Sequence, residues 1–569
     1  EIYMGDWSSD VCSSDLGNTG RLFNEFGIAV AGSVAISGFV ALTLTPMLCA
    51  KILRVPKSHG PLFRAFERGF NAISDGYARS LSWALGQRAM VIGAAVVTVA
   101  VAVVLFKNLK REFIPREDRG FFITLIIAPE GSTLAYTEDY QQRVEAIIAK
   151  TADVQSFFSV TGGFLGSTSR GIVFTRLNDW AERNRMVWDV IGEVQPQYFG
   201  IPGALIFATN PPAFGGFGGA PVQFVIRHPN FGQLTQGMDT LLKRARQIPG
   251  LVNVDTDLRV NKPELTVAFD RDRAEDVGVS VRDVAGTLQT LLGGREVSTF
   301  TRDNKLYNVI VQLEPSARAT PSDMSGLYVR GRDGGLVQLS AVTRIDEGVG
   351  PRSLAHYDRV RSATLTASLA PGFALGEAID SLRVLANEVL PTAASTRLAG
   401  ESRELEESGS ALYFAFGLAL VAVFMVLAAQ FESLIHPFTV LLAVPLAVTG
   451  ALLTLKGAGS TLNLYSQIGM ILLIGLVTKN SILLVEYSNQ LRERGLDLFA
   501  AVQESGRIRL RPILMTSVST ITGAVPIALG LGAGASSRRP LGYAIVGGVF
   551  FSTILTYMEI GRASCRERV

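Results

Sequence analysis

The chain has 569 residues, of which 18% are charged and 48% hydrophobic, and its formal net charge is +3. Soluble domains carry about 25% charged residues, so the deficit indicates a membrane protein, while a net charge near zero argues against nucleic acid as a partner. Its three cysteines are too few for a disulfide framework.

The two ends of the chain follow no structural pattern. The first 16 residues, EIYMGDWSSDVCSSDL, show neither a signal-peptide pattern nor a helical or strand period. They and the closing EIGRASCRERV can be written in codons as common sequencing-library adapter. We therefore expect residues 1–16 and 559–569 to be translated adapter, without function and with few contacts.

Apolar runs close to the ~20 residues that cross a bilayer flank a long charged region. Two of them occupy residues 17–52 and 89–106, and a basic linker of residues 53–88 joins them. The charged region spans residues 107–407, and residues 408–558 hold five further runs, the last expected to be truncated. So many runs are not typical of core helices in a soluble enzyme, and they predict a polytopic α-helical membrane protein.

Lysine and arginine predict the orientation of these spans. They are concentrated in the Lys51–Arg88 and Ser488–Arg511 connections, which alternating spans place on one side. The positive-inside rule makes that side cytoplasmic and residues 107–407 external. The first connection also carries an apolar stripe with helical spacing, which predicts a helix on the membrane surface; a short soluble helix is the alternative. The stripe consists of Phe63, Phe66, Phe70, Ile73, Tyr77 and Leu81.

The external region alternates strand and helix patterns. A strand over residues 121–129 is followed by an amphipathic helix over residues 133–150, and the alternation recurs later in the chain. Two rounds of strand–helix–strand–strand predict α+β subdomains of the split βαβ, ferredoxin-like kind. The four histidines are scattered, and no metal, cofactor or catalytic spacing is found, so we expect a protein that is not an enzyme.

Ionisable residues inside the apolar runs carry the chemistry. Lys479 lies well within one span, two helical turns before Glu486 on the same face. Such a charge is expected to face a partner or a water path, although snorkelling to the interface is the alternative. The next span has Arg509 near its start and Thr516 two helical turns further into the membrane. Because burial lowers the pKa of a lysine, Lys479 suits a proton path, whereas an arginine keeps its charge.

Several motifs together resemble the C-terminal half of a resistance–nodulation–division (RND) efflux permease of the hydrophobe/amphiphile, multidrug branch. The resemblance covers nearly all of residues 17–558. It implies a homotrimeric, proton-driven exporter of the Gram-negative inner membrane with a large periplasmic region, a periplasmic adaptor and an outer-membrane channel. The motifs are ALTLTPMLCA, FIPREDRGFF, AAQFESLIHPFTVLLAVPLAVTGALL, GLVTKNSILLVEY and RLRPILMTS.

The resemblance also assigns residues. Lys479, Arg509 and Thr516 match one half's share of the family's proton relay, whose paired aspartates belong to the other half. A second set of residues resembles the lining of the family's deep pocket for hydrophobic or amphiphilic molecules, with ordinary sandwich core as the alternative. That set is Phe158, Phe164, Leu165, Ile172, Phe174 and Phe207.

Two points bear on the substrate and on the activity. Gly163 stands where drug pumps often have a bulky aromatic residue, so the resemblance does not determine the shape of the pocket here. The external methionines are few and widely spaced, which favours organic substrates over metal ions. A non-pumping protein of the same fold, for lipid sensing or protein export, remains the alternative, as does an inert fragment.

Overall fold

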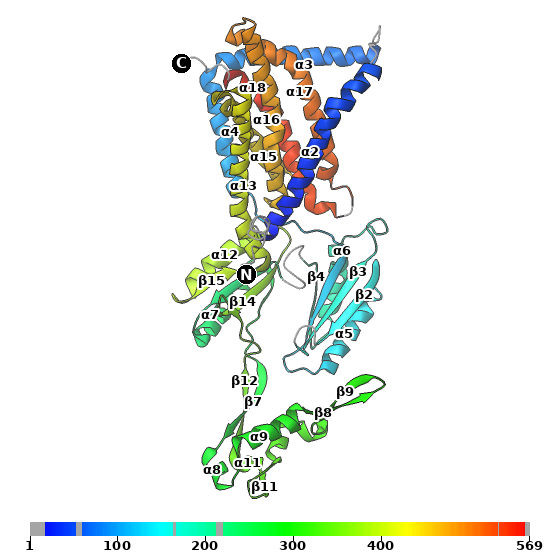
Figure 1. Ribbon diagram of the computed structural model, residues 1–569, viewed down its shortest axis with the longest axis vertical. Helices are drawn as coiled ribbons and strands as arrows, with labels where there is room; N and C mark the ends of the chain where they lie inside the picture. Colours follow the sequence, from blue (N-terminus) through cyan, green and yellow to red (C-terminus); the bar gives the residue numbers. More distant parts are fainter. Residues whose placement is uncertain (1–16, 53–59, 163–166, 212–219, 533, 564–569) are drawn as a thin grey trace, which may run out of the picture.

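The computed structural model describes residues 17–52, 60–162, 167–211, 220–532 and 534–563. A helical bundle forms one end of the molecule, two β-sheets with their helices lie in the middle, and a smaller unit forms the other end (Figure 1). Residues 1–16, expected to be adapter, lie outside the described residues. At the other end, residues 559–563 continue the last helix.

The bundle consists of long helices that are apolar on most of their surface. Six helical stretches among the described residues are long and apolar enough to cross a membrane. The seventh predicted span lies in the last helix, α18. The helices are α2 (Gly17–Ile52), α4 (Arg88–Asn108), α13 (Gly400–Phe431), α14 (Ile435–Leu441), α15 (Ala443–Gly457), α16 (Leu464–Glu493), α17 (Leu498–Leu529) and α18 (Arg539–Ala563).

Helix α18 is the centre of the bundle, because it packs against α15, α16 and α17. Glycines allow this close approach. A Cβ added at Gly547 would overlap the side chain of Thr454 on α15, and one at Gly548 would overlap Leu473 on α16. Small residues at such contacts let helix backbones approach in a membrane, where dispersion contacts replace the hydrophobic effect between helices.

Helix α3 (Pro61–Gly86) lies across the end of the bundle that is far from the sheets (Figure 1). The second half of its apolar stripe packs on the bundle: Tyr77 and Leu81 meet the backbone of α17 at Gly506. Gln503 of α17 also donates a hydrogen bond of 2.8 Å to Ser82. The two basic connections therefore meet at one end of the bundle. The side chains of Phe63 and Phe66 lie outside the described set.

The first sheet is four-stranded, in the order β2-β3-β1-β4, and its neighbouring strands are antiparallel. Helices α5 and α6 cover one face of it, where Phe122 and Val173 are fully buried with Val144 and Val190 of the helices. Its elements are β1 (Phe121–Ile127), α5 (Leu134–Ile148), β2 (Val154–Thr161), β3 (Arg170–Leu177), α6 (Val187–Phe199) and β4 (Leu205–Thr209).

The second sheet is five-stranded, in the order β13-β14-β5-β15, with β6 paired to β14. Helices α7 and α12 cover one of its faces, around a core that includes Phe224, Met238 and Leu382. Its elements are β5 (Val222–Arg227), α7 (Phe231–Ala245), β6 (Leu251–Thr256), β13 (His356–Tyr357), β14 (Val360–Leu369), α12 (Leu375–Val389) and β15 (Ser395–Leu398).

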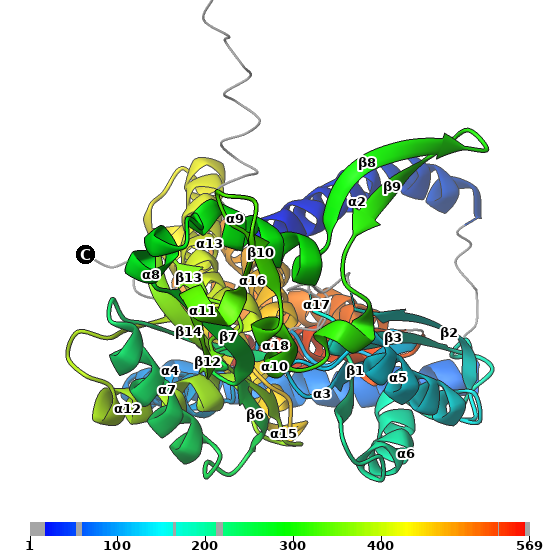
Figure 2. The same cartoon turned by 90° about the horizontal axis from the view of Figure 1, so that it is seen from below.

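The smaller unit is inserted between β6 and β13. The paired strands β7 and β12 lead into it, and the hairpin β8–β9 projects sideways from it (Figure 2). It comprises β7 (Lys262–Phe269), α8 (Arg271–Asp276), α9 (Val281–Leu288), a π-helical turn (Gln289–Gly293), β8 (Arg295–Arg302), β9 (Lys305–Val311), α10 (Pro321–Ser325), β10 (Tyr328–Arg330), β11 (Leu336–Gln338), α11 (Leu339–Val342) and β12 (Thr343–Gly350).

Candidate functional site

Lys479 lies at the middle of α16 and faces away from the bundle. It is the sixteenth of the 30 residues of this helix, about 22 Å from the first residue at a rise of about 1.5 Å per residue. Its side chain is exposed, and among the described residues it has neither an ion pair nor a hydrogen bond. A charge in hydrocarbon costs at least about 2.5–3.5 kcal/mol, so this orientation calls for a partner beyond the described helices.

A buried polar cluster stands behind Lys479 on the inner side of α16. The Asn480 amide lies 3.4 Å from the Ser517 hydroxyl of α17. The Thr553 hydroxyl of α18 also donates to Ser517, at 2.9 Å. These contacts join three helices and hold the rotation of α16 that turns Lys479 outward. The sequence analysis missed this cluster, although polar residues in apolar runs were the available signal.

Arg509 and Thr516 both lie on α17 and are half-buried. The guanidinium of Arg509 stacks over the Tyr487 ring of α16, 4.5 Å from its centroid, and its Nε has no hydrogen-bond partner among the described residues. Thr516 donates to the Ile513 carbonyl of its own helix, at 3.0 Å, and precedes Ser517 in the sequence. Lys479 and Thr516 are thus each next in sequence to a residue of the Asn480–Ser517 contact.

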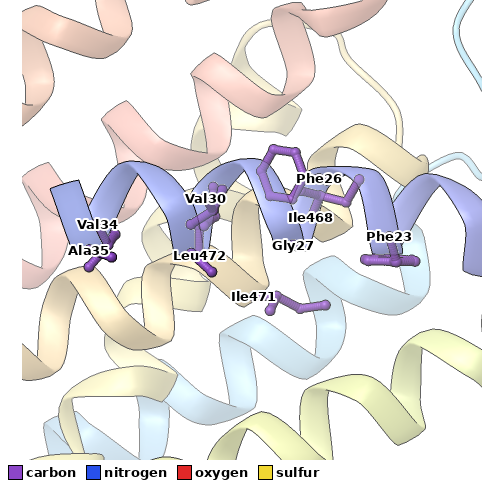
Figure 3. Close-up of a pocket in the computed structure, with 10 residues that line it drawn as sticks. Phe23, Phe26, Gly27, Val30, Val34, Ala35, Ile468, Ile471 and Leu472 are labelled. Atoms are coloured by element: carbon purple, nitrogen blue, oxygen red, sulfur yellow. The ribbon is translucent and has the colours of Figure 1, made fainter.

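An apolar groove of about 590 Å³ separates α2 from α16 (Figure 3). Phe23, Phe26 and Val30 line it from α2, and Ile471 and Leu472 line it from α16. Leu472 lies seven residues before Lys479 and therefore on the same side of the helix. The outward face of α16 thus continues from an apolar groove to an ionisable group at mid-span.

The other predicted set lies on the first sheet. Phe158, Ile172, Phe174 and Phe207 all point to the face opposite α5 and α6, since they alternate with the residues that face these helices. The rings of Phe158 and Phe174 stack with centroids 6.3 Å apart. Phe207 pairs with Leu125 on β1, which pairs in turn with Ile172.

These four side chains form what we call the aromatic wall. Phe158 is at the sheet edge and 65% exposed, whereas Ile172 in the middle is 3% exposed. Phe174 and Phe207 are not adjacent, because strand β1 lies between their strands. Phe164 and Leu165, the remaining members of the predicted set, lie outside the described residues.

Two features, taken together, define the class of protein. Its bundle consists of membrane-spanning helices with a lysine at mid-span, and its sheet region carries an apolar wall. This combination is typical of a multi-pass membrane transporter, in which ionisable groups inside the bilayer belong to ion pathways.

The chain belongs to the AcrB/AcrD/AcrF family, which it matches over residues 16–560, and this is a family of RND efflux permeases. It is 32% identical over 549 residues to an uncharacterized transporter of Haemophilus influenzae. It is 33% identical over 555 residues to the toluene efflux pump membrane transporter TtgB of Pseudomonas putida, and 33% identical over 556 residues to the antibiotic efflux pump membrane transporter ArpB of the same species. In each case the match covers 95% of this chain and 53% of the relative, so the chain spans about half the length of these relatives.

Proposed function

We propose that this chain is part of an inner-membrane efflux pump that exports hydrophobic or amphiphilic molecules in exchange for protons. The observation that carries the proposal is Lys479, an exposed charge at mid-span with no ion pair or hydrogen bond among the described residues. Its partner would be an acidic residue in a further part of the protein, since the relatives are nearly twice as long as the matched region.

In this mechanism a proton breaks the pairing of Lys479. While the acidic partner is charged, it attracts the ammonium group strongly in the low dielectric of the bundle. Protonation of the partner removes that attraction, and the helices can shift relative to one another. Arg509 would supply a fixed positive charge near the cytoplasmic end, and Thr516 a hydroxyl along the proton path.

The sheet region would take up the substrate. The aromatic wall offers broad apolar faces with few polar groups, which bind varied molecules without strict geometry. We propose that both sheets are split βαβ units on the periplasmic side of the membrane. We also propose that the protein assembles as a homotrimer with a periplasmic adaptor and an outer-membrane channel.

The test is drug efflux by the full-length pump that carries this chain, with Lys479→Ala at matched expression. We expect efflux to be abolished, while substrate binding persists because the wall lies in another region. Lys456→Ala is a matched control, since Lys456 is an exposed lysine in the last turn of α15 rather than at mid-span. Wild-type efflux by the Lys479→Ala protein would show that Lys479 takes no part in coupling, and would favour a protein that does not pump protons.

A further inference from the structure

The side chain of Arg170, beside the aromatic wall, has no hydrogen bond or ion pair among the described residues. Arg170 is the first residue of β3 and lies on the same sheet face as Ile172 and Phe174, two and four residues further along the strand. Gly171, between them, faces α5, where an added Cβ would meet Gln141. The alternation along a strand therefore directs Arg170 to the side of the wall.

Two other arginines and two carboxylates surround Arg170. Arg352 Nη1 donates to Glu130 at 3.2 Å, and Arg259 Nη2 donates to Asp255 at 2.6 Å. Arg259 Nη1 also lies 3.9 Å from Glu130, whose side chain is 5% exposed. Each carboxylate in this cluster is thus already paired with an arginine other than Arg170.

Arg170 is the surplus charge of the cluster. Its Nε is buried and has no hydrogen-bond partner among the described residues. Burial lowers the pKa of Arg170 most, Arg352 and Arg259 lower it further, and Glu130 and Asp255 raise it. An arginine stays protonated in proteins, so these surroundings leave a positive charge with unused donors at the end of an apolar surface.

We propose that Arg170 binds the anionic group of an amphiphilic substrate whose apolar body lies along the aromatic wall. This inference rests on the proposed substrate-binding role of the wall and adds a charge preference to it. A guanidinium offers two parallel donors to a carboxylate, sulfate or phosphate. Four residues separate Arg170 from Phe174, about 13 Å at the rise of a strand. A ligand that reaches both positions therefore needs an anionic group on an apolar body about 10–15 Å long.

The test compares two probes with the same ring system and opposite charge, pyrenebutyrate and pyrenebutyl-trimethylammonium. They are titrated by fluorescence against the full 569-residue chain in nanodiscs of zwitterionic lipid. Arg170→Gln should weaken binding of the butyrate about 10- to 100-fold, the range for hydrogen bonds to charged groups, and leave the cationic probe unchanged. The affinity of Arg170→Lys for the butyrate should lie between those of the wild type and Arg170→Gln, since lysine keeps the charge but loses the bidentate geometry.

Arg143→Gln is the control, because Arg143 is an exposed arginine of α5, the helix that covers the opposite face of the sheet. It should bind the butyrate as the wild type does. Unchanged binding of the butyrate by Arg170→Gln would overturn the inference, and so would an equal loss of both probes, which would make Arg170 a structural tie. If the wild-type chain binds both probes equally, the substrate-binding role of the wall is retained, but the proposed preference for anions is wrong. If it binds neither, the substrate-binding role of the wall fails as well.

Discussion

Replacing Asp118 with alanine would break a buried ion pair that holds the first sheet together. Asp118 precedes β1, and its carboxylate accepts hydrogen bonds from Arg183 at 2.7 and 2.8 Å. It also accepts from the backbone N–H groups of Gly120 and of Val187, the first residue of α6, each at 2.9 Å. The substitution would therefore detach α6 and its preceding loop from the start of β1.

The magnitude follows from the burial of the pair. The side chains of Arg183 and Asp118 are 1% and 3% exposed, so alanine would leave an uncompensated buried guanidinium. Removing one partner of a buried pair costs about 3–5 kcal/mol. If the sheet opens as one unit, amide exchange in β1 and β3 should accelerate by about 10²- to 4 × 10³-fold, at about 1.4 kcal/mol per tenfold.

The assay is hydrogen–deuterium exchange of the full chain, with Asp139→Ala as the matched control. Asp139 pairs with Arg143 at 2.6 Å on the surface of α5, where both side chains are more than half exposed. Surface pairs contribute about 0–1 kcal/mol, so the control should accelerate exchange by no more than about fivefold. Equal exchange in the two variants would refute the argument that burial determines the contribution of this pair.

The pair also predicts a pH dependence. Burial alone would raise the pKa of Asp118, but the hydrogen bonds from Arg183, Gly120 and Val187 outweigh it and lower the pKa below the ordinary value of 3.8. A lowered folded-state pKa means that this contribution is complete above pH 3.8 and is lost as the pH falls through the folded-state value. Acidification in that range should accelerate exchange in the wild type and have less effect in Asp118→Ala.

Two further predictions concern the helical bundle. Gly547→Leu should prevent α18 from approaching α15 and should lower the stability of the bundle by at least about 1–3 kcal/mol, the cost of overpacking. A lower melting temperature of the protein in detergent would show this. Gly475→Leu is the control, because a Cβ added at Gly475 meets no neighbouring atom. Asn480→Leu should release the contact to Ser517 and cost about 0.6–2 kcal/mol. It should also reduce efflux of the full-length pump less than Lys479→Ala does, and efflux as low as that of Lys479→Ala would contradict a positioning role for Asn480.

Features that depend on a few neighbouring residues could be predicted from the sequence. The apolar runs of α4 and α16 are long enough to cross a bilayer, and this property belongs to each run by itself. The strand predicted over residues 121–129 likewise depends on that segment alone, and β1 occupies Phe121–Ile127. Motifs in the apolar runs identified the family before any contact between helices was known.

Tertiary structure decided which side of each element meets a neighbour. Lys479 faces outward because Asn480, Ser517 and Thr553, on three different helices, turn α16 in one direction. The central place of α18 depends on glycines that fit against α15 and α16. No period within a single helix encodes such fits, because each contact needs a surface that another helix supplies.

The arginine cluster shows the same division most clearly. Glu130 and Arg352 meet although 222 residues separate them in the chain, because the linker after β12 returns to the end of the first sheet. Because Arg352 pairs with the Glu130 carboxylate, this carboxylate does not pair with Arg170, which remains the surplus positive charge beside the aromatic wall. Arg170 is the first residue of β3, but no local pattern shows whether its charge is paired. Only the convergence of distant segments leaves it without a partner among the described residues, since charges are balanced by neighbours in space.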